Sequence, residues 1–96
     1  MIQTVLAYIA LMGVPSDFPV EVSWEIRGME GVHGYTICGF RDRVVQSCKV
    51  ELNWLNPGDE HRLAKHEACH VAIWYHHGQG IDPHGSEFEE CMSRPL

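Results

Sequence analysis

The feature that most constrains this chain is a pentad of the form H-E-x-x-H, His66 to His70, inside a stretch with helical spacing. Residues four apart on an α-helix lie on one face about one turn apart, so the imidazoles of His66 and His70 can converge on one ion. Glu67 projects roughly 100° around the helix from His66, which places its carboxylate beside the ion, where it can deprotonate a bound water. The pentad therefore predicts a zinc site of the kind used in metal-assisted hydrolysis.

A third protein ligand has to come from outside the pentad. His77 lies about 10 Å beyond His70 along the same helix, whereas a zinc–nitrogen bond is only about 2.0–2.1 Å long, and His76 fails for the same reason. His84 follows a flexible turn that lets the chain double back, so it can complete a three-histidine site with water as the fourth ligand. Glu87 is the competing candidate, because a site of two histidines and one glutamate is chemically as acceptable.

The composition suits a small acidic protein. Ninety-six residues with 45% hydrophobic content fit one domain with a modest core. The formal net charge of −6 argues against direct nucleic-acid binding, because phosphate contacts need clustered Lys and Arg and the seven basic residues here are scattered. The apolar run 2–12 is shorter than the roughly 20 residues that span a bilayer, so we expect no membrane segment.

The same apolar run lacks a basic leader region and a small-residue cleavage site, which argues against a signal peptide. We therefore expect a cytoplasmic protein. Its cysteines show no C-x-x-C spacing, which argues against a zinc ribbon or a thioredoxin-like motif. Without a secretion signal, we expect reduced and partly buried thiols rather than disulfides. The cysteines are Cys38, Cys48, Cys69 and Cys91.

The hydrophobic pattern predicts an α+β fold in which helices cover one face of a three-stranded antiparallel sheet. Apolar residues at helical spacing indicate a first helix, which Gly13 and Pro15 end. Alternation of apolar and polar residues, interrupted by glycine-rich and polar turns, indicates three strands. The expected first helix is 2–12, and the expected strands are 20–27, 35–40 and 44–55.

The helix that carries the pentad is expected to begin at Asn56 and Pro57 and to end near His77, with Gly78 as a left-handed terminator. Ser86 with Glu89 three residues later reads as a capping box that opens a last short helix, 86–92. The pentad then lies in the middle of the longer helix, where the backbone is most rigid.

Two motifs together carry a resemblance to a known family. The pentad, followed after a glycine-containing loop by His84-Gly85-Ser86-Glu87-Phe88, resembles the SprT-like metallopeptidases, which include the Spartan proteases and are similar to minimal gluzincin-like metallopeptidases. The family pattern is H-E-x-x-H, a loop and H-G-x-x-F. The resemblance implies a small zincin-like domain over residues 1–96, with zinc bound by His66, His70 and His84 and with Glu67 as general base.

Many members of that family continue into a C-terminal zinc ribbon or DNA-binding region, and we expect none here because the chain reaches Leu96 without the cysteines to build one. Phe88 is expected to anchor the last helix beneath the site and so hold His84 in place. Cys69 is expected to point away from the ion, because both histidines of the pentad point toward it.

The predicted function is zinc-dependent hydrolysis of a peptide or protein substrate, with Glu67 as the base. By analogy with related zinc peptidases, an extended substrate would lie along the edge of the third strand near Glu51 to Asn53. An alternative is a zinc-stabilised module that binds a protein partner without catalysis, since a metal can supply much of the folding energy of so small a core. Glu67 argues against that alternative, because a structural site needs no base. A zinc amidase acting on a non-protein substrate is a third reading.

Overall fold

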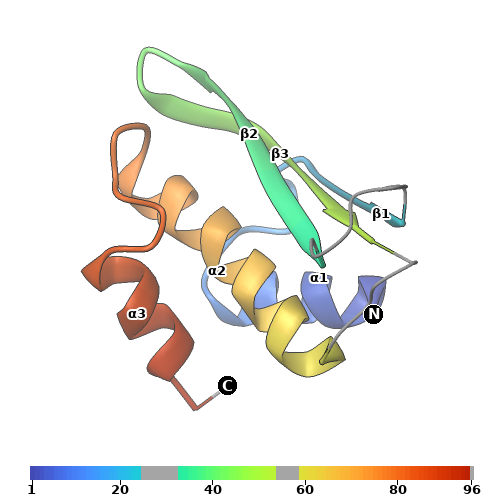
Figure 1. Cartoon of the computed structure of the whole chain (residues 1–96). Helices are drawn as coiled ribbons and strands as arrows, with labels where there is room; N and C mark the ends of the chain where they lie inside the picture. The colour runs from blue at the N-terminus through green and yellow to red at the C-terminus, as the bar shows by residue number, and fades with distance from the viewer. Residues whose placement is uncertain (25–32, 54–58, 96) are drawn as a thin grey trace.

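The structure is a computed structural model and describes residues 1–24, 33–53 and 59–95. Within these residues the chain forms one helix, three strands and two further helices, which confirms the α+β class (Figure 1). The helices are α1 (Ile2–Leu11), α2 (Glu60–His77) and α3 (Ser86–Ser93), and the strands are β1 (Val20–Trp24), β2 (Gly34–Arg41) and β3 (Val44–Leu52). None of the helices in this part of the chain is long and apolar enough to cross a membrane.

The sheet is mixed, so the predicted all-antiparallel arrangement is wrong. Its order is β1-β3-β2, with β1 parallel to β3 and β2 antiparallel to β3. A tight turn joins β2 to β3, and its central residues Asp42 and Arg43 both have positive φ, 52° and 68°, as a two-residue hairpin turn requires. Period-two alternation defines which side chains are buried but is the same for parallel and antiparallel neighbours, so the sequence pattern could not supply the direction of β1.

The core lies between one face of the sheet and the helices α1 and α2 (Figure 1). Small side chains on the buried face of α2, including Ala64 and Ala68, let this helix approach its neighbours closely. On β3 the predicted alternation holds from Cys48 to Leu52, because Cys48, Val50 and Leu52 are buried. Val45 is also buried but is out of phase with them, because a register shift in the pairing with β2 falls between Ser47 and Val45. α1 contributes Val5 and Ile9 to the same core.

Two predicted helix starts can be compared with the structure. The predicted start of α2 at Asn56 and Pro57 is wrong, because Asp59 is extended and is the N-cap, and its carboxylate accepts a hydrogen bond from the Arg62 N–H at 3.1 Å. Asn56 and Pro57 themselves lie outside the described residues. The capping box at α3 is wrong, because Gly85 is the N-cap and the Ser86 hydroxyl instead donates to the Glu87 carboxylate. The predicted strand ends 25–27 and 54–55 also lie outside the described residues.

All four cysteines form disulfides, so the expectation of reduced thiols is wrong. Cys38 and Cys48 face each other across β2 and β3, and the second disulfide joins Cys69 of α2 to Cys91 of α3. Spacing along the chain did not reveal these pairs, because both depend on which elements become neighbours in the fold. The cytoplasmic location stays a prediction that the cysteines no longer support, since disulfides persist mainly in oxidising compartments.

Gly78 ends α2 with a positive φ of 80°, as predicted, but its ψ of −170° is extended and not that of a left-handed helical cap. A Cβ on Gly78 would lie 2.6 Å from the carbonyl oxygen of Arg43, in the β2–β3 turn. We expect Gly78→Ala to lower the free energy of unfolding by about 1–3 kcal/mol, measured by urea denaturation. Gly80→Ala is the matched control, because Gly80 also has positive φ but its Cβ would meet only the flexible end of the Arg43 side chain. An equal loss in both variants would contradict the role of the close backbone contact.

Candidate metal centre

Three histidines meet at one point of the fold. His66 and His70 lie one turn apart on α2, and His84 lies in the turn that leads into α3. Their candidate ligand nitrogens all lie within 4.8 Å of one another, and the Nε2 atoms of His66 and His70 are 3.1 Å apart. Tetrahedral zinc with bonds of about 2.05 Å separates its ligand atoms by roughly 3.3 Å. The three imidazoles are therefore close enough to bind a metal ion after a small closing movement.

The turn before α3 aims His84 at the helix. The Asp82 carboxylate accepts a hydrogen bond from the backbone N–H of His84 at 3.0 Å, and the Asp82 carbonyl accepts one from Gly85 at 3.2 Å. The His84 ring then lies with its centroid 4.7 Å from that of His70 and 5.5 Å from that of His66. The local turn thus brings a residue distant in sequence onto the face of the pentad.

Phe88 packs against all three histidines, as the predicted anchor would. Its ring centroid lies 4.9 Å from that of His66, 4.7 Å from that of His70 and 5.0 Å from that of His84. The Trp74 ring stacks near His70 at 5.6 Å. These contacts restrict the orientation of the imidazole planes.

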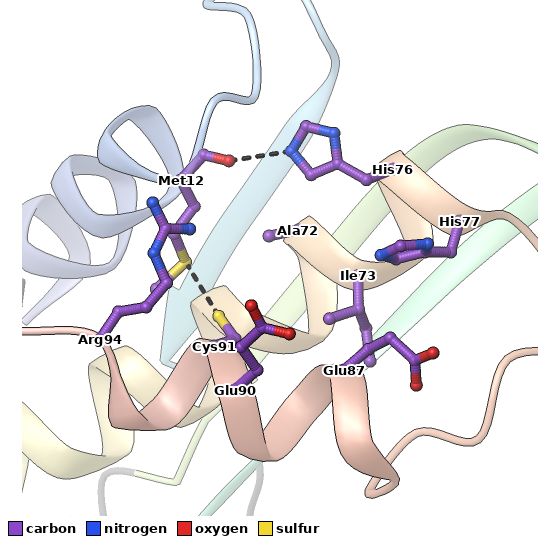
Figure 2. A pocket seen from close by; sticks show the side chains of 9 residues that line it. All are labelled: Met12, Ala72, Ile73, His76, His77, Glu87, Glu90, Cys91 and Arg94. Carbon is purple, nitrogen blue, oxygen red and sulfur yellow. Dashed lines mark hydrogen bonds between the residues drawn. The ribbon is translucent and has the colours of Figure 1, made fainter.

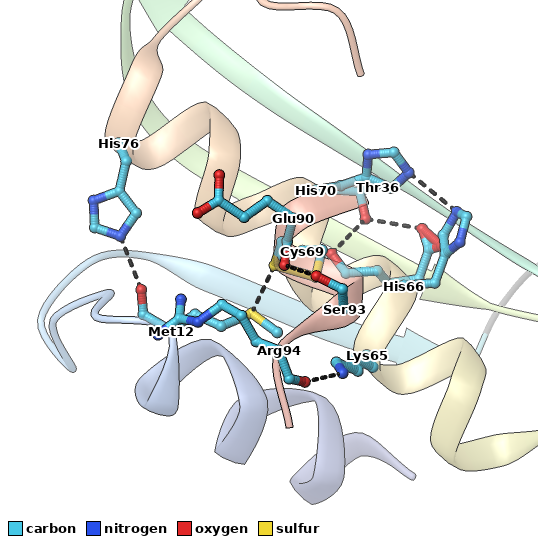
Figure 3. The surroundings of a disulfide bond; sticks show 12 residues. Met12, Thr36, Lys65, His66, Cys69, His70, His76, Glu90, Ser93 and Arg94 are labelled. Carbon is cyan, nitrogen blue, oxygen red and sulfur yellow. Dashed lines mark hydrogen bonds and ion pairs between the residues drawn. A yellow bond between two sulfur atoms is a disulfide. The ribbon is translucent and has the colours of Figure 1, made fainter. Parts of the chain in front are cut away.

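Glu67 is buried beside the histidines, with 2% of its surface exposed. Its Oε1 accepts a hydrogen bond from the Thr36 hydroxyl at 3.0 Å, and its Oε2 lies 3.9 Å from Nε2 of His66 (Figure 3). Burial raises the pKa of Glu67 to about 7, and the Thr36 hydrogen bond opposes that rise. A carboxyl group with such a pKa can both take up and release a proton near neutral pH.

Thr36 is the functional residue that the sequence interpretation missed. It lies on β2, 31 positions before Glu67, and its hydroxyl also lies 3.4 Å from the Glu67 carbonyl oxygen. Only the packing of β2 on α2 brings the two residues together, and no sequence motif links them.

The imidazoles are kept neutral by their surroundings. Burial lowers the pKa of His70 to about 4, and the neighbouring His66 and His84 add to the effect. Burial, followed by the charges of His84 and Arg62, also lowers the pKa of His66. Because a metal binds the neutral form of imidazole, these shifts leave the nitrogen lone pairs available near neutral pH. Nδ1 of His70 is buried without a hydrogen-bond partner within the described residues.

In the metal-free chain, His70 and Glu67 have opposite effects on stability. His70 has a pKa of about 4 in the folded chain, below its ordinary 6.5, so its contribution to the free energy of unfolding is lost as the pH falls from 6.5 to 4. Glu67 has a pKa of about 7 in the folded chain, above its ordinary 4.5, so its contribution to the free energy of unfolding is lost as the pH rises from 4.5 to 7. The two contributions offset each other in the wild type.

Glu67→Gln removes the titration of Glu67, so the pH dependence of stability that comes from His70 should no longer be offset. We expect the free energy of unfolding of this variant, relative to the wild type, to rise by roughly 2 kcal/mol between pH 4 and pH 6.5. Urea denaturation at a series of pH values, with a chelator present, measures the difference. If the free energy of unfolding varied with pH in the same way in both proteins, the raised pKa of Glu67 would be contradicted.

The remaining candidates lie away from the cluster. Glu87 lines a separate cavity of about 320 Å³ together with His76 and His77, and is not part of the group of converging ligand atoms (Figure 2). His76 donates from Nε2 to the Met12 carbonyl at 2.9 Å, which joins the end of α2 to the end of α1. Cys69 faces α3 and not the histidines, as expected, but it does so as half of a disulfide.

A second cavity, of about 490 Å³, opens directly beside the metal cluster. His66 and Glu67 form one end of it, and Arg62 and Leu63 continue its wall along α2, opposite Gly34 at the start of β2. A molecule bound in this cavity would therefore reach the buried carboxyl group.

Comparison of the chain with models of protein families, with curated proteins and with solved structures finds no match. The resemblance to SprT-like metallopeptidases therefore rests on the two sequence motifs and stays a prediction. What the structure adds to those motifs is the meeting of His66, His70 and His84 at one point.

Proposed function

We propose that the protein is a zinc-dependent endopeptidase of the zincin type. The observation that carries this proposal is the convergence of three imidazoles next to the buried carboxyl group of Glu67, which is not itself one of the converging ligands. Imidazole donors suit zinc, copper, iron and nickel alike. Zinc is favoured because an adjacent glutamate with a pKa of about 7 has a use in hydrolysis and none in a site that only stabilises the fold.

Each group of residues at the site has a separate role in the proposed reaction. A zinc ion held by His66, His70 and His84 would polarise the peptide carbonyl and lower the pKa of a coordinated water. Glu67 takes the proton from the attacking water and passes it to the leaving amine. Thr36 holds one oxygen of the Glu67 carboxyl group and leaves the other, Oε2, directed toward His66.

The substrate strand belongs on β2 rather than on the third strand. The predicted edge at Glu51 to Asn53 is wrong, because β3 is central and pairs on both sides. The Asn53 N–H donates to the His33 carbonyl, so the alternation of the antiparallel pair turns the backbone groups of Gly34 and Thr36 away from β3. Within the described residues no strand pairs with this outer side of β2.

An extended peptide that added to the outer side of β2 would pass close to Glu67, because Thr36 on the same strand contacts that carboxyl group. One of its side chains would then enter the cavity between Gly34 and Leu63. Backbone pairing would supply affinity without sequence preference, so we propose unfolded or extended protein segments as the substrate class.

The test is hydrolysis of an unfolded protein. The zinc-loaded chain is incubated with casein, and the products are identified by mass spectrometry, in parallel with a sample stripped by 1,10-phenanthroline and one to which zinc is then restored. We expect cleavage that the chelator abolishes and zinc restores. Binding of casein without cleavage at any zinc concentration would contradict the proposal and favour a zinc-stabilised binding module.

A further inference from the structure

The disulfide Cys69–Cys91 joins the two segments that supply the metal ligands (Figure 3). Cys69 lies inside the pentad, directly before His70, and Cys91 lies on α3, which begins two residues after His84. The Cα atoms of the two cysteines are 5.9 Å apart, and the two residues are 0% and 7% exposed. One covalent bond thus connects the helix of His66 and His70 to the helix that follows His84.

α3 has few other means of staying in place. It has eight residues, which is too short for a helix to be stable by itself, and only Phe88 and Cys91 are buried within it. Phe88 packs on the histidine rings themselves. Met92 is partly buried against the core, Cys91 Sγ contacts Met12 Sδ at 3.7 Å, and the Lys65 ammonium donates to the carbonyl of Arg94, just after the end of α3. Among the described residues, the disulfide is the one covalent bond between α3 and α2, and it acts independently of the metal cluster.

We propose that the Cys69–Cys91 disulfide is a positioning link for the third ligand, so that metal affinity depends on the oxidation state of the chain. The proposal rests on the three-histidine metal site of the proposed function. With the disulfide intact, α3 stays against α2 and His84 is held facing His66 and His70. With it broken, only non-covalent contacts hold α3, and His84 must be ordered anew each time a metal binds, which costs affinity.

The disulfide can be reached by a small reductant. Cys91 lines the cavity of about 320 Å³ between α1, α2 and α3 (Figure 2). A thiolate of a dithiol attacks Sγ of Cys91 and releases the Cys69 thiolate, which takes up a proton. The second thiol of the reductant then displaces Cys91, so that two protein thiols and a cyclic oxidised dithiol result. The two electrons come from the dithiol.

The second disulfide of the chain provides a matched control. Cys38 and Cys48 are opposite residues of β2 and β3, which are paired on both sides of this position. Neither residue is adjacent to a histidine of the cluster. Breaking this bond also removes a disulfide from the chain, but it frees no segment that carries a ligand.

The experiment measures the zinc dissociation constant by competition with a chromophoric chelator. We expect Cys69→Ala/Cys91→Ala to bind zinc at least about tenfold more weakly than the oxidised wild type, and Cys38→Ala/Cys48→Ala to bind it within about threefold of wild type. An unchanged dissociation constant in Cys69→Ala/Cys91→Ala, or an equal loss in both variants, would overturn the proposal.

Two further arms separate positioning of His84 from general loss of structure. In a His84→Ala background, removing Cys69–Cys91 should cause no further loss of affinity, because the ligand it positions is already absent. In the Cys38→Ala/Cys48→Ala chain, a phosphine reduces Cys69–Cys91 and is itself oxidised to its oxide with oxygen from water. This reduction should weaken zinc binding as much as the alanine substitutions do, with unchanged far-UV circular dichroism, and reoxidation should restore the affinity for zinc. A further loss in the His84→Ala background would overturn the proposal.

The readout is the affinity for zinc and not peptide hydrolysis, so the two proposals can fail separately. A redox-dependent affinity in a chain that cleaves no peptide would support the positioning link and contradict the endopeptidase. Absence of zinc binding by the oxidised wild type would overturn both.

Discussion

Glu67→Gln is expected to lose peptide hydrolysis while keeping its metal. Glutamine has nearly the same shape as glutamate and can still accept the hydrogen bond that the Thr36 hydroxyl donates. It cannot take a proton from the attacking water. Loss of a general base costs about 10²–10⁴-fold in rate, so cleavage of casein should fall by that factor at neutral pH.

The matched control for this variant is Glu87→Gln, the same chemical change on a glutamate of α3 that lines the separate cavity. Its hydrolysis rate should equal that of the wild type. Both variants should contain as much zinc as the wild type by elemental mass spectrometry. Full hydrolysis by Glu67→Gln would exclude this carboxyl group as the base, and loss of zinc from that variant would make Glu67 a ligand.

Removal of zinc is expected to destabilise the chain by several kcal/mol. The metal would bind only the folded chain, because the turn at Asp82 and the packing of α3 on α2 bring His84 to the pentad. A ligand present at 1,000 times its dissociation constant stabilises the folded state by about 4 kcal/mol. For a domain of this size each kcal/mol shifts the melting temperature by about 4–8 °C, so chelation should lower it by about 15–30 °C.

Thermal unfolding followed by circular dichroism, with zinc and with EDTA, measures this shift. His70→Ala is the control: it removes a ligand on the rigid part of α2, so zinc and EDTA should give the same melting temperature in that variant. A wild type whose melting temperature does not respond to zinc would contradict a metal bound by all three histidines.

The sequence predicts well what is local. Spacing along one helix was enough to pair His66 with His70, because the geometry of an α-helix fixes which side chains share a face. The positive φ of Gly78 at the end of α2 and the buried face of β3 from Cys48 to Leu52 follow from equally local rules. His84 needed one more step, a turn that reverses the chain, and among the described residues the group of converging ligand atoms contains His84 and not Glu87.

What the sequence could not supply depends on contacts between distant segments. The parallel pairing of β1 with β3 could not be predicted, because apolar and polar side chains alternate in the same way in parallel and antiparallel strands. The hydrogen bond of Thr36 to Glu67 and the disulfide of Cys69 with Cys91 span 31 and 22 positions and exist only once β2 and α3 pack on α2. The pattern of the apolar run 2–12 led us to expect reduced cysteines, whereas the fold places each cysteine beside another.

The most direct test of the three-histidine site is the zinc content of the chain, measured by elemental mass spectrometry on protein purified without added metal. The site predicts one zinc per chain in the wild type, retained in Glu87→Gln and largely lost in His84→Ala. Full retention of zinc in His84→Ala, or absence of metal from the wild type even after incubation with zinc, would contradict it.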